Sequence, residues 1–123
     1  MAHRVNRYSF GEITIDGKTY HHDVIIYKEK ILDWWRAESH NVSINDADKI
    51  VRLKPKTIIF GTGDAGVMRV PRETLDYLEK LGIKVLLYKT EEAGQKYNEM
   101  SEGALSAGAS AEADVAAALH LTC

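Results

Sequence analysis

Cysteine is almost absent from this sequence, since Cys123 is the only one among 123 residues. A single thiol can form neither an intrachain disulfide nor an all-cysteine metal site, so a reducing compartment fits and we expect a cytoplasmic protein. No run approaches the ~18 apolar residues of a membrane-spanning helix, and residues 1–10 carry no apolar block typical of an export signal. We therefore expect no membrane partner.

Net charge is also low, because 16 Lys and Arg stand against 18 Asp and Glu, for a net charge of −2. Such a balance provides no broad attraction to phosphate backbones, so we do not expect a nucleic-acid partner. The charge is uneven, since no Lys or Arg follows Lys96. The segment Glu102–Asp114 is consequently acidic, and it is rich in alanine.

The sequence does have enough apolar residues for a core, with 45% hydrophobic and 28% charged residues. This mixture is typical of a globular protein and excludes intrinsic disorder. The length suits one domain, so we expect a single domain over residues 1–123. Within it, we expect residues 1–8 to be a loose N-terminal segment and residues 103–114, where glycine and serine recur, to be a loop.

The first third favours β-structure. The pair Asp16-Gly17 readily takes the positive φ angles of a two-residue turn, and it separates two segments of β-formers, Glu12–Ile15 and Lys18–Tyr20. A hairpin is therefore predicted. The apolar run Val24–Tyr27 suits a strand buried on both faces, and Ile31–Trp35 is a further strand candidate.

Two helices are indicated by their start and stop signals. Ser43 and Asp46 place oxygen acceptors and negative charge where a helix begins, and this helix should end near Lys54, just before a proline. Pro71 suits the first turn of a second helix, and Gly82 can end it in a left-handed conformation.

The second helix is flanked by two apolar segments, Thr57–Phe60 and Ile83–Tyr88. This order predicts a βαβ unit whose two strands are parallel neighbours. Thr90 can cap a third helix. Helical spacing places three residues on one face of that helix: Ala93, Tyr97 and Met100.

A G-x-G-x-x-G motif follows the first strand of this unit, with Gly61, Gly63 and Gly66 as its glycines and Thr62 and Asp64 between them. In dinucleotide sites such glycines let backbone amides approach a pyrophosphate at a helix start. Here the next helix begins well past the motif. The alternative is a turn that requires glycine for backbone reasons, and we favour this alternative.

The five histidines raise the question of a metal site: His3, His21, His22, His40 and His120. Metal binding requires several ligands that converge on one point. Adjacent His21 and His22 would face opposite ways on a strand, and His120 with Cys123 forms a two-ligand fragment at most. We therefore expect no metal and no other cofactor. His120 and Cys123 are also the only candidate base and nucleophile pair, at a chain end where positioning is usually poor, so we assign no catalytic residue.

Two tryptophans stand side by side and are followed by an arginine, as Trp34-Trp35-Arg36. Because side chains alternate on a strand, one indole should be buried and the other should lie on the opposite face. The plain interpretation is core packing plus a surface patch. An exposed indole also suits the anchor of a protein interface, so Trp35 and Arg36 are candidate partner-site residues.

A recognisable combination of residues runs in order along the chain: Asp16-Gly17, Tyr20, Asp23-Val24, Trp35-Arg36, His40, Ile58–Gly63, Thr90, Ala93, Tyr97-Asn98 and Ala117–Cys123. In this combination the chain resembles the adipogenesis-associated Mth-type domain family, whose mitochondrial branch includes the NADH dehydrogenase (complex I) assembly factor three. The resemblance covers about Ser9 to Cys123. One departure is that Glu102–Asp114 lacks the arginines of the Gly-Arg-rich turn usual in relatives, which weakens any anion groove that relies on them.

The resemblance implies a compact three-layer α/β domain with a mixed central sheet, an N-terminal β-hairpin layer and about three helices. It also implies that Val115–Leu121 is a strand, although its alanines favour a helix by intrinsic propensity. No established catalytic activity comes with the family, and some relatives have assembly or partner-binding roles.

We therefore expect a non-catalytic binding or assembly module, a monomer or weak homodimer, that contacts a protein partner through Trp34, Trp35 and Arg36 or through the Gly61–Gly66 loop. This expectation rests on the lack of a convergent set of acid, base, nucleophile or metal ligands in the sequence.

The competing hypothesis is a small enzyme or a nucleotide-binding or cofactor-binding protein that uses the Gly61–Gly66 loop. In that case Thr62 and Asp64 would lie near the ligand, with Asn98 or His120 as polar contacts. A glycine-flanked strand end in a βαβ unit is a common ligand site.

Overall fold

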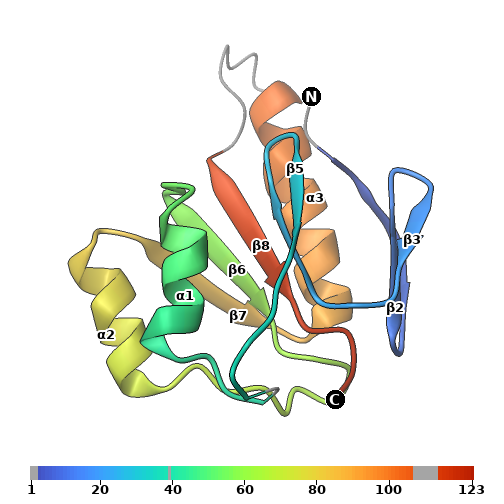
Figure 1. Ribbon diagram of the computed structural model, residues 1–123. Coiled ribbons are helices and arrows are strands. Elements are labelled where there is room, and N and C mark those ends of the chain that lie inside the picture. The colour runs from blue at the N-terminus through green and yellow to red at the C-terminus, as the bar shows by residue number, and fades with distance from the viewer. Residues whose placement is uncertain (1–2, 39, 107–113) are drawn as a thin grey trace.

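Two β-sheets and three helices make up the computed structural model, which describes residues 3–38, 40–106 and 114–123 (Figure 1). In chain order the elements are β1 (Val5–Ser9), β2 (Glu12–Ile15), β3 (Lys18–Tyr20), β4 (Val24–Tyr27), β5 (Lys30–Asp33), α1 (Ile44–Val51), β6 (Thr57–Gly61), α2 (Arg72–Lys80), β7 (Lys84–Tyr88), α3 (Thr90–Ser106) and β8 (Val115–Leu119).

The N-terminal sheet is antiparallel, with the strand order β1-β2-β3. Asp16 has a φ of 50° and Gly17 a φ of 81°, which are the two positive angles that a tight hairpin turn needs, so the predicted hairpin is confirmed. The loose segment predicted over residues 1–8 is wrong from Val5 onward, because Val5–Ser9 pairs with β2. Charged residues break up the hydrophobic pattern there, and pairing with β2 rather than local propensity holds β1 in place.

The second sheet is mixed, with the strand order β5-β4-β8-β6-β7. Strand β4 runs antiparallel to β5 and β8, whereas β6 runs parallel to β7 and β8. The predicted βαβ unit is therefore confirmed, with Ile58 opposite Val85 in register. The predicted strand over Val115–Leu121 is also confirmed, and β8 ends at Leu119. Its alanines are fully buried between two layers, which outweighs their helical propensity.

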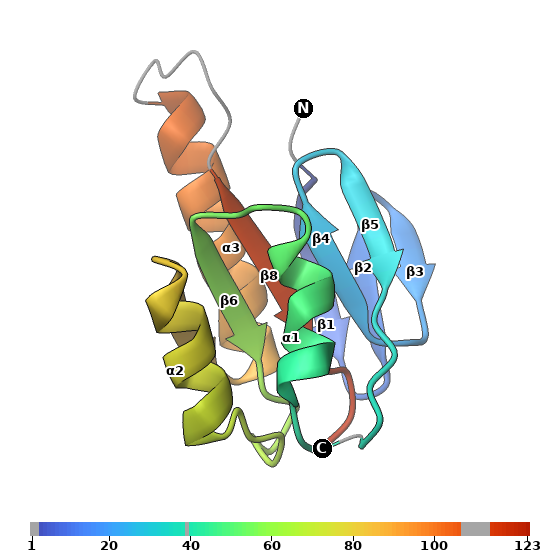
Figure 2. The same ribbon diagram turned by 60° about the vertical axis from the view of Figure 1, so that its left-hand side comes forward.

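Three layers result from this arrangement (Figures 1 and 2). Helices α1 and α2 cover one face of the mixed sheet, where Ile50 and Leu78 pack against Ile58 and Phe60. Helix α3 and the N-terminal sheet cover the other face. One buried cluster there joins the mixed sheet to the N-terminal sheet and α3: Ile13, Ile15, Ile26, Ile59, Tyr97 and Ala117. The predicted three-layer α/β fold is confirmed.

The helix boundaries follow the predicted signals closely. The Ser43 hydroxyl accepts a hydrogen bond from the Asp46 N–H at 3.1 Å, and the Asp46 carboxylate accepts one from the Ser43 N–H at 3.0 Å. This reciprocal pair begins α1. Helix α2 begins after Pro71, and Gly82 follows it with a φ of 77°.

Helix α3 is longer than the sequence predicted. It continues to Ser106, so the loop predicted over residues 103–114 is wrong for residues 103–106. A glycine costs a helix only about 1 kcal/mol relative to alanine, and the strong helix formers alanine and leucine follow Gly103. Residues 107–113 of that prediction lie outside the described residues. Within the described ranges, none of the helices combines the length and the apolar character needed to cross a bilayer.

Candidate functional site

Three polar residues meet where β4 begins and β8 ends. Val24 pairs with Leu119 in the antiparallel register of these strands, so the residues just outside the pair, Asp23 and His120, lie side by side. The Trp34 N–H donates to the Asp23 carbonyl at 3.0 Å. This bond draws the chain after β5 toward the same point and brings Arg36 to it.

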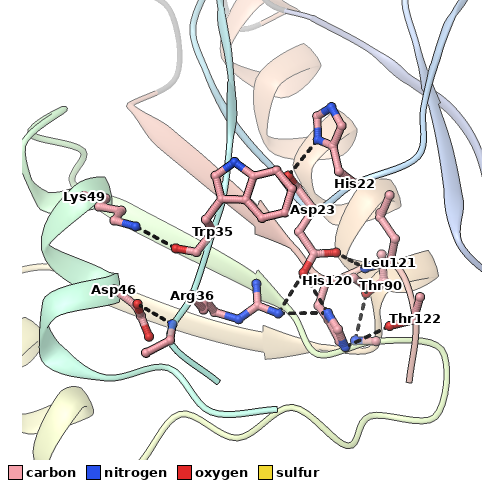
Figure 3. A network of polar contacts seen from close by, with 12 residues as sticks. His22, Asp23, Trp35, Arg36, Asp46, Lys49, Thr90, His120, Leu121 and Thr122 are labelled. Atoms are coloured by element: carbon pink, nitrogen blue, oxygen red, sulfur yellow. Dashed lines mark hydrogen bonds and ion pairs between the residues drawn. The ribbon is translucent and has the colours of Figure 1, made fainter. Parts of the chain in front are cut away.

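The side chains of Asp23, Arg36 and His120 form a closed network, which Figure 3 shows. Asp23 Oδ2 lies 2.7 Å from Arg36 Nη2 and 2.8 Å from His120 Nδ1. Asp23 Oδ1 accepts the Leu121 N–H at 2.8 Å. The Arg36 and His120 side chains are only 2% and 3% exposed, and that of Asp23 is 16% exposed. Three donors therefore converge on one mostly buried carboxylate.

These contacts determine the ionisation of Asp23. Burial by itself raises the pKa of the carboxyl, but hydrogen bonds from His120, Leu121 and Arg36 favour the charged form more strongly. The pKa of Asp23 consequently lies below its ordinary value, and Asp23 is a carboxylate at neutral pH.

The backbone of His120 is fixed from the opposite side. Its carbonyl accepts the Thr90 hydroxyl at 2.5 Å, and its N–H donates to the Gly61 carbonyl at 3.0 Å. The same Thr90 oxygen accepts the Gly63 N–H at 2.9 Å. The start of α3 and the glycine loop therefore fix the backbone of His120, while Asp23 and Arg36 contact its side chain.

A cavity of about 300 Å³ opens beside the network. Its lining residues come from the segment before β4, the segment after β5 and the end of β8: His21, His22, Asp23, Trp34, Trp35, Arg36, His120 and Thr122. A small ligand or one side chain of a partner fits this volume.

The two tryptophans occupy opposite environments, as the alternation of side chains predicted, although β5 already ends at Asp33. Trp34 is 2% exposed, and the Arg36 guanidinium carbon lies 4.4 Å from the centre of its ring. Trp35 is 66% exposed. The buried indole thus supports the arginine, and the exposed indole lies on the rim of the cavity.

The glycine loop uses its backbone amides within the protein. Two amides bond to the segment around the start of α3: Thr62 N–H donates to the Tyr88 carbonyl, and Gly63 N–H donates to Thr90 Oγ1. Two more bond to the end of the chain: Asp64 N–H donates to the Thr122 carbonyl, and Val67 N–H donates to the Cys123 carbonyl. The Met68 N–H donates back to the loop, at the Thr62 carbonyl. Gly61 and Gly63 are required by close packing, since a Cβ on either would lie within 2.8 Å of a neighbouring atom. This geometry favours the turn interpretation over a phosphate cradle, because a cradle needs free amides.

The remaining predicted residues lie elsewhere. Thr62 and Gly66 line a different cavity of about 610 Å³, and Asp64 is exposed. Asn98 clamps β1 to α3, because its Nδ2 donates to Val5 O at 2.7 Å and its Oδ1 accepts the Val5 N–H at 2.9 Å. Of the predicted site residues, Trp34, Trp35, Arg36 and His120 line the cavity beside Asp23 together.

His21, His22 and His120 line one cavity, and His40 contacts the His120 ring, but they are not arranged as a set of metal ligands. His21 lies 3.9 Å from Glu12, and His22 lies 3.3 Å from Asp33. Across the described residues, no group of three or more His, Cys, Asp and Glu side chains is arranged to hold a metal ion. Among the described residues, the side-chain partner of His120 Nε2 is Thr122 Oγ1 at 3.4 Å.

Sequence reasoning missed Asp23, His22 and Thr122 as site residues. The signals for Asp23 were its place directly before a buried strand and its part in the family resemblance. Its role depends on the pairing of β4 with β8, which joins residues 97 positions apart in the chain. Thr122 follows His120 by two positions, the spacing that puts side chains on one face of an extended segment.

The chain matches the model of a known protein family. A model described as a protein of unknown function (DUF498/DUF598) matches residues 5–120. The chain belongs to this family. The Mth-type resemblance is thereby confirmed, and a solved Bordetella pertussis protein of the same fold is described as a Mth938-like domain.

Solved structures similar to this family member share its fold over nearly the whole chain. A Bordetella parapertussis protein is 20% identical with a TM-score of 0.77, and the match covers 98% of this chain and 96% of that one. A conserved hypothetical protein from Pyrococcus horikoshii is 23% identical with a TM-score of 0.77, over 98% and 99%. The Bordetella pertussis domain is 17% identical with a TM-score of 0.72, over 97% and 85%.

Proposed function

We propose that this domain is a non-catalytic binding module whose protein partner contacts Trp35 and the rim of the adjoining cavity. The observation that carries the proposal is the 66% exposure of a tryptophan beside a cavity of about 300 Å³. Large aromatic side chains that anchor in or beside pockets dominate the energetics of protein interfaces.

The backbone around Trp35 is held before any partner arrives. Lys49 Nζ donates to the Trp35 carbonyl at 2.6 Å, and the Ala37 N–H donates to Asp46 Oδ1 at 3.4 Å, so α1 holds the segment on both sides of Arg36. A fixed backbone lowers the entropic cost of binding. The preceding strand, β5, is an edge of the mixed sheet, and Leu32 on it is 38% exposed. A partner could therefore extend its contact along this edge.

The polar groups of the two candidate sites make many of their hydrogen bonds within the protein. The Asp23 oxygens accept hydrogen bonds from three groups, so this carboxylate holds Arg36 and His120 in place rather than acting as a base itself. The alternative, an enzyme or nucleotide-binding protein built on the Gly61–Gly66 loop, has less support, because five amides in and after that loop donate within the chain. Three candidate polar residues of that alternative, Thr62, Asn98 and His120, also line separate cavities.

The proposal is tested by affinity capture from native lysate with quantitative mass spectrometry, using wild type, Trp35→Ala and Phe10→Ala. Phe10 is the matched control, since it is an aromatic residue that is 62% exposed in the turn between β1 and β2. We expect proteins that wild type and Phe10→Ala retain and Trp35→Ala loses. Equal retention by all three variants, or no selective retention by wild type, would contradict the proposal.

A thermal-shift panel of nucleotides and cofactors tests the alternative. A ligand at about 100 times its dissociation constant stabilises a protein by about 2.7 kcal/mol. We expect no shift with this panel. A shift that Gly66→Ala abolishes would instead favour the glycine loop as the functional site.

A further inference from the structure

The hydrogen-bond network determines which nitrogen of His120 can accept a proton. Asp23 Oδ2 lies 2.8 Å from His120 Nδ1, and two facing lone pairs at that distance would repel each other. Nδ1 therefore carries the hydrogen and donates to Asp23. His120 Nδ1 and Arg36 Nη2 then both donate to Asp23 Oδ2, which explains why these two nitrogens lie only 3.0 Å apart. This arrangement leaves Nε2 as the basic nitrogen.

Nε2 has little to bind within the protein. Its neighbour Thr122 Oγ1 lies at 3.4 Å, longer than a normal hydrogen bond between oxygen and nitrogen. Both His120 and Thr122 line the cavity. One basic nitrogen and one hydroxyl thus lie close together on the cavity wall with hydrogen-bonding capacity to spare.

Charge balance determines what can bind there. Arg36 and Asp23 cancel each other, so the network with a neutral His120 has no net charge. Bringing a bare anion against the His120 side chain, which is only 3% exposed, would be costly. Protonation of Nε2 removes that cost, because the new imidazolium lies between the Asp23 carboxylate and the incoming anion.

We propose that the cavity binds a carboxylate together with one proton, with His120 Nε2–H and the Thr122 hydroxyl each donating to a carboxylate oxygen. The proton comes from solvent and stays on Nε2, and no covalent bond changes. A carboxylate fits because it carries a single charge and presents two acceptors side by side to two neighbouring donors. The inference rests on the proposed function only in taking this cavity as the binding site.

Other titratable groups lie around His120, and the experiment must distinguish them from it. Those that line the cavity or contact the ring are Asp23, His21 and His22 before β4, Arg36 after β5 and His40 before α1. His22 serves as the matched variant, because it lines the same cavity and lies 3.3 Å from Asp33.

The test measures proton uptake by calorimetric titration with acetate in buffers of different ionisation enthalpy, from pH 7.5 to 8.5. We expect about one proton bound per acetate, which makes the affinity fall about tenfold per pH unit. Chemical shifts should change at His120 and Thr122 in parallel. Binding without proton uptake, or no shift change at these residues, would overturn the proposal.

Variants identify the group that takes the proton. His120→Gln should abolish both acetate binding and proton uptake, whereas the matched variant His22→Gln should retain both. Thr122→Val keeps the imidazole and should weaken binding while one proton is still taken up. Uptake that persists in His120→Gln, or that is lost in His22→Gln, would contradict the assignment. The measurements on wild type decide the question even if His120→Gln does not fold.

Two probes distinguish the source of the carboxylate. Acetate represents a free acid, and N-acetyl-glutamate N-methylamide represents an acidic side chain of a partner protein. Tighter binding of the peptide-like probe would point to the partner. Because these titrations contain no partner protein, their failure is distinguishable from a failure of the capture experiment with Trp35→Ala.

Discussion

Gly63 packs directly against the backbone of Cys123. A Cβ at residue 63 would lie 2.4 Å from the Cys123 carbonyl carbon and 2.8 Å from the Thr122 carbonyl oxygen. Gly63 also has a φ of 104°, a conformation that side-chain-bearing residues rarely adopt. The glycine loop and the chain after β8 therefore fit together only because residue 63 has no side chain.

Gly63→Ala should lower the free energy of unfolding by about 2–4 kcal/mol, because it combines backbone strain with a clash against backbone atoms. Urea denaturation measures this change. The matched control is Gly11→Ala, which has a φ of 80° and nothing within 4 Å of the added Cβ. That variant should lose only about 1 kcal/mol. Equal losses in both variants would show that the packing against Cys123 contributes nothing.

Asp23→Asn should destabilise the protein by about 2–3 kcal/mol at pH 7, because it removes the charge that pairs with the buried Arg36 and His120. The measurement is the difference in unfolding free energy between wild type and variant. An Asp23→Asn protein as stable as wild type would show that the network adds no net stability.

The pH dependence of that difference has a defined sign. Burial raises the pKa of Asp23, but the hydrogen bonds outweigh it, so the folded pKa lies below the unfolded value of about 4. The stability from Asp23 is therefore fully present above pH ~5 and is lost as pH falls through the folded pKa. The difference between wild type and Asp23→Asn should shrink as the pH falls below about 4.

Much of the fold could be predicted because its signals are local. The Asp16-Gly17 turn, the Ser43 cap and the stop at Gly82 each act over a few residues, and all three lie where the sequence places them. The strand β8 required the family resemblance, since its buried alanines carry no local strand signal.

The site could be predicted only in part, for the same physical reason. Trp35, Arg36 and His120 are conspicuous residues and were named as candidates, but Asp23, which joins two of them, appeared only as part of the family resemblance. Its function arises from the pairing of β4 with β8, a contact between distant segments. The two hydrogen bonds of Asn98 to Val5 could not be predicted, because the position of β1 on α3 was unknown from the sequence.

Asn98→Ala should loosen β1, because both of its hydrogen bonds go to the backbone of Val5. We expect a loss of about 1–2 kcal/mol in the free energy of unfolding and faster hydrogen exchange at the Val5 amide. Exchange in β6 should change only by the global loss in stability. Glu99→Ala, on the exposed side of the same helix, serves as the control and should leave Val5 exchange unchanged. Unchanged Val5 exchange in Asn98→Ala would contradict the clamp.

The pairing of His3 with Asp16 ties the start of the chain to the first hairpin, and it should appear in the titration of His3. Burial lowers the pKa of His3, but hydrogen bonds to the Asp16 carboxylate and the Glu29 carbonyl outweigh it, so the pKa lies above 6.5. The stability from this pairing is therefore fully present below pH 6.5 and is lost as pH rises through the raised pKa. Two-dimensional NMR of the imidazole ring measures the midpoint, which should fall in Asp16→Asn. Because Asn at residue 16 still tolerates the positive φ of 50°, the hairpin should persist in that variant. An identical His3 midpoint in wild type and Asp16→Asn, with the hairpin intact, would show that the carboxylate does not hold the ring.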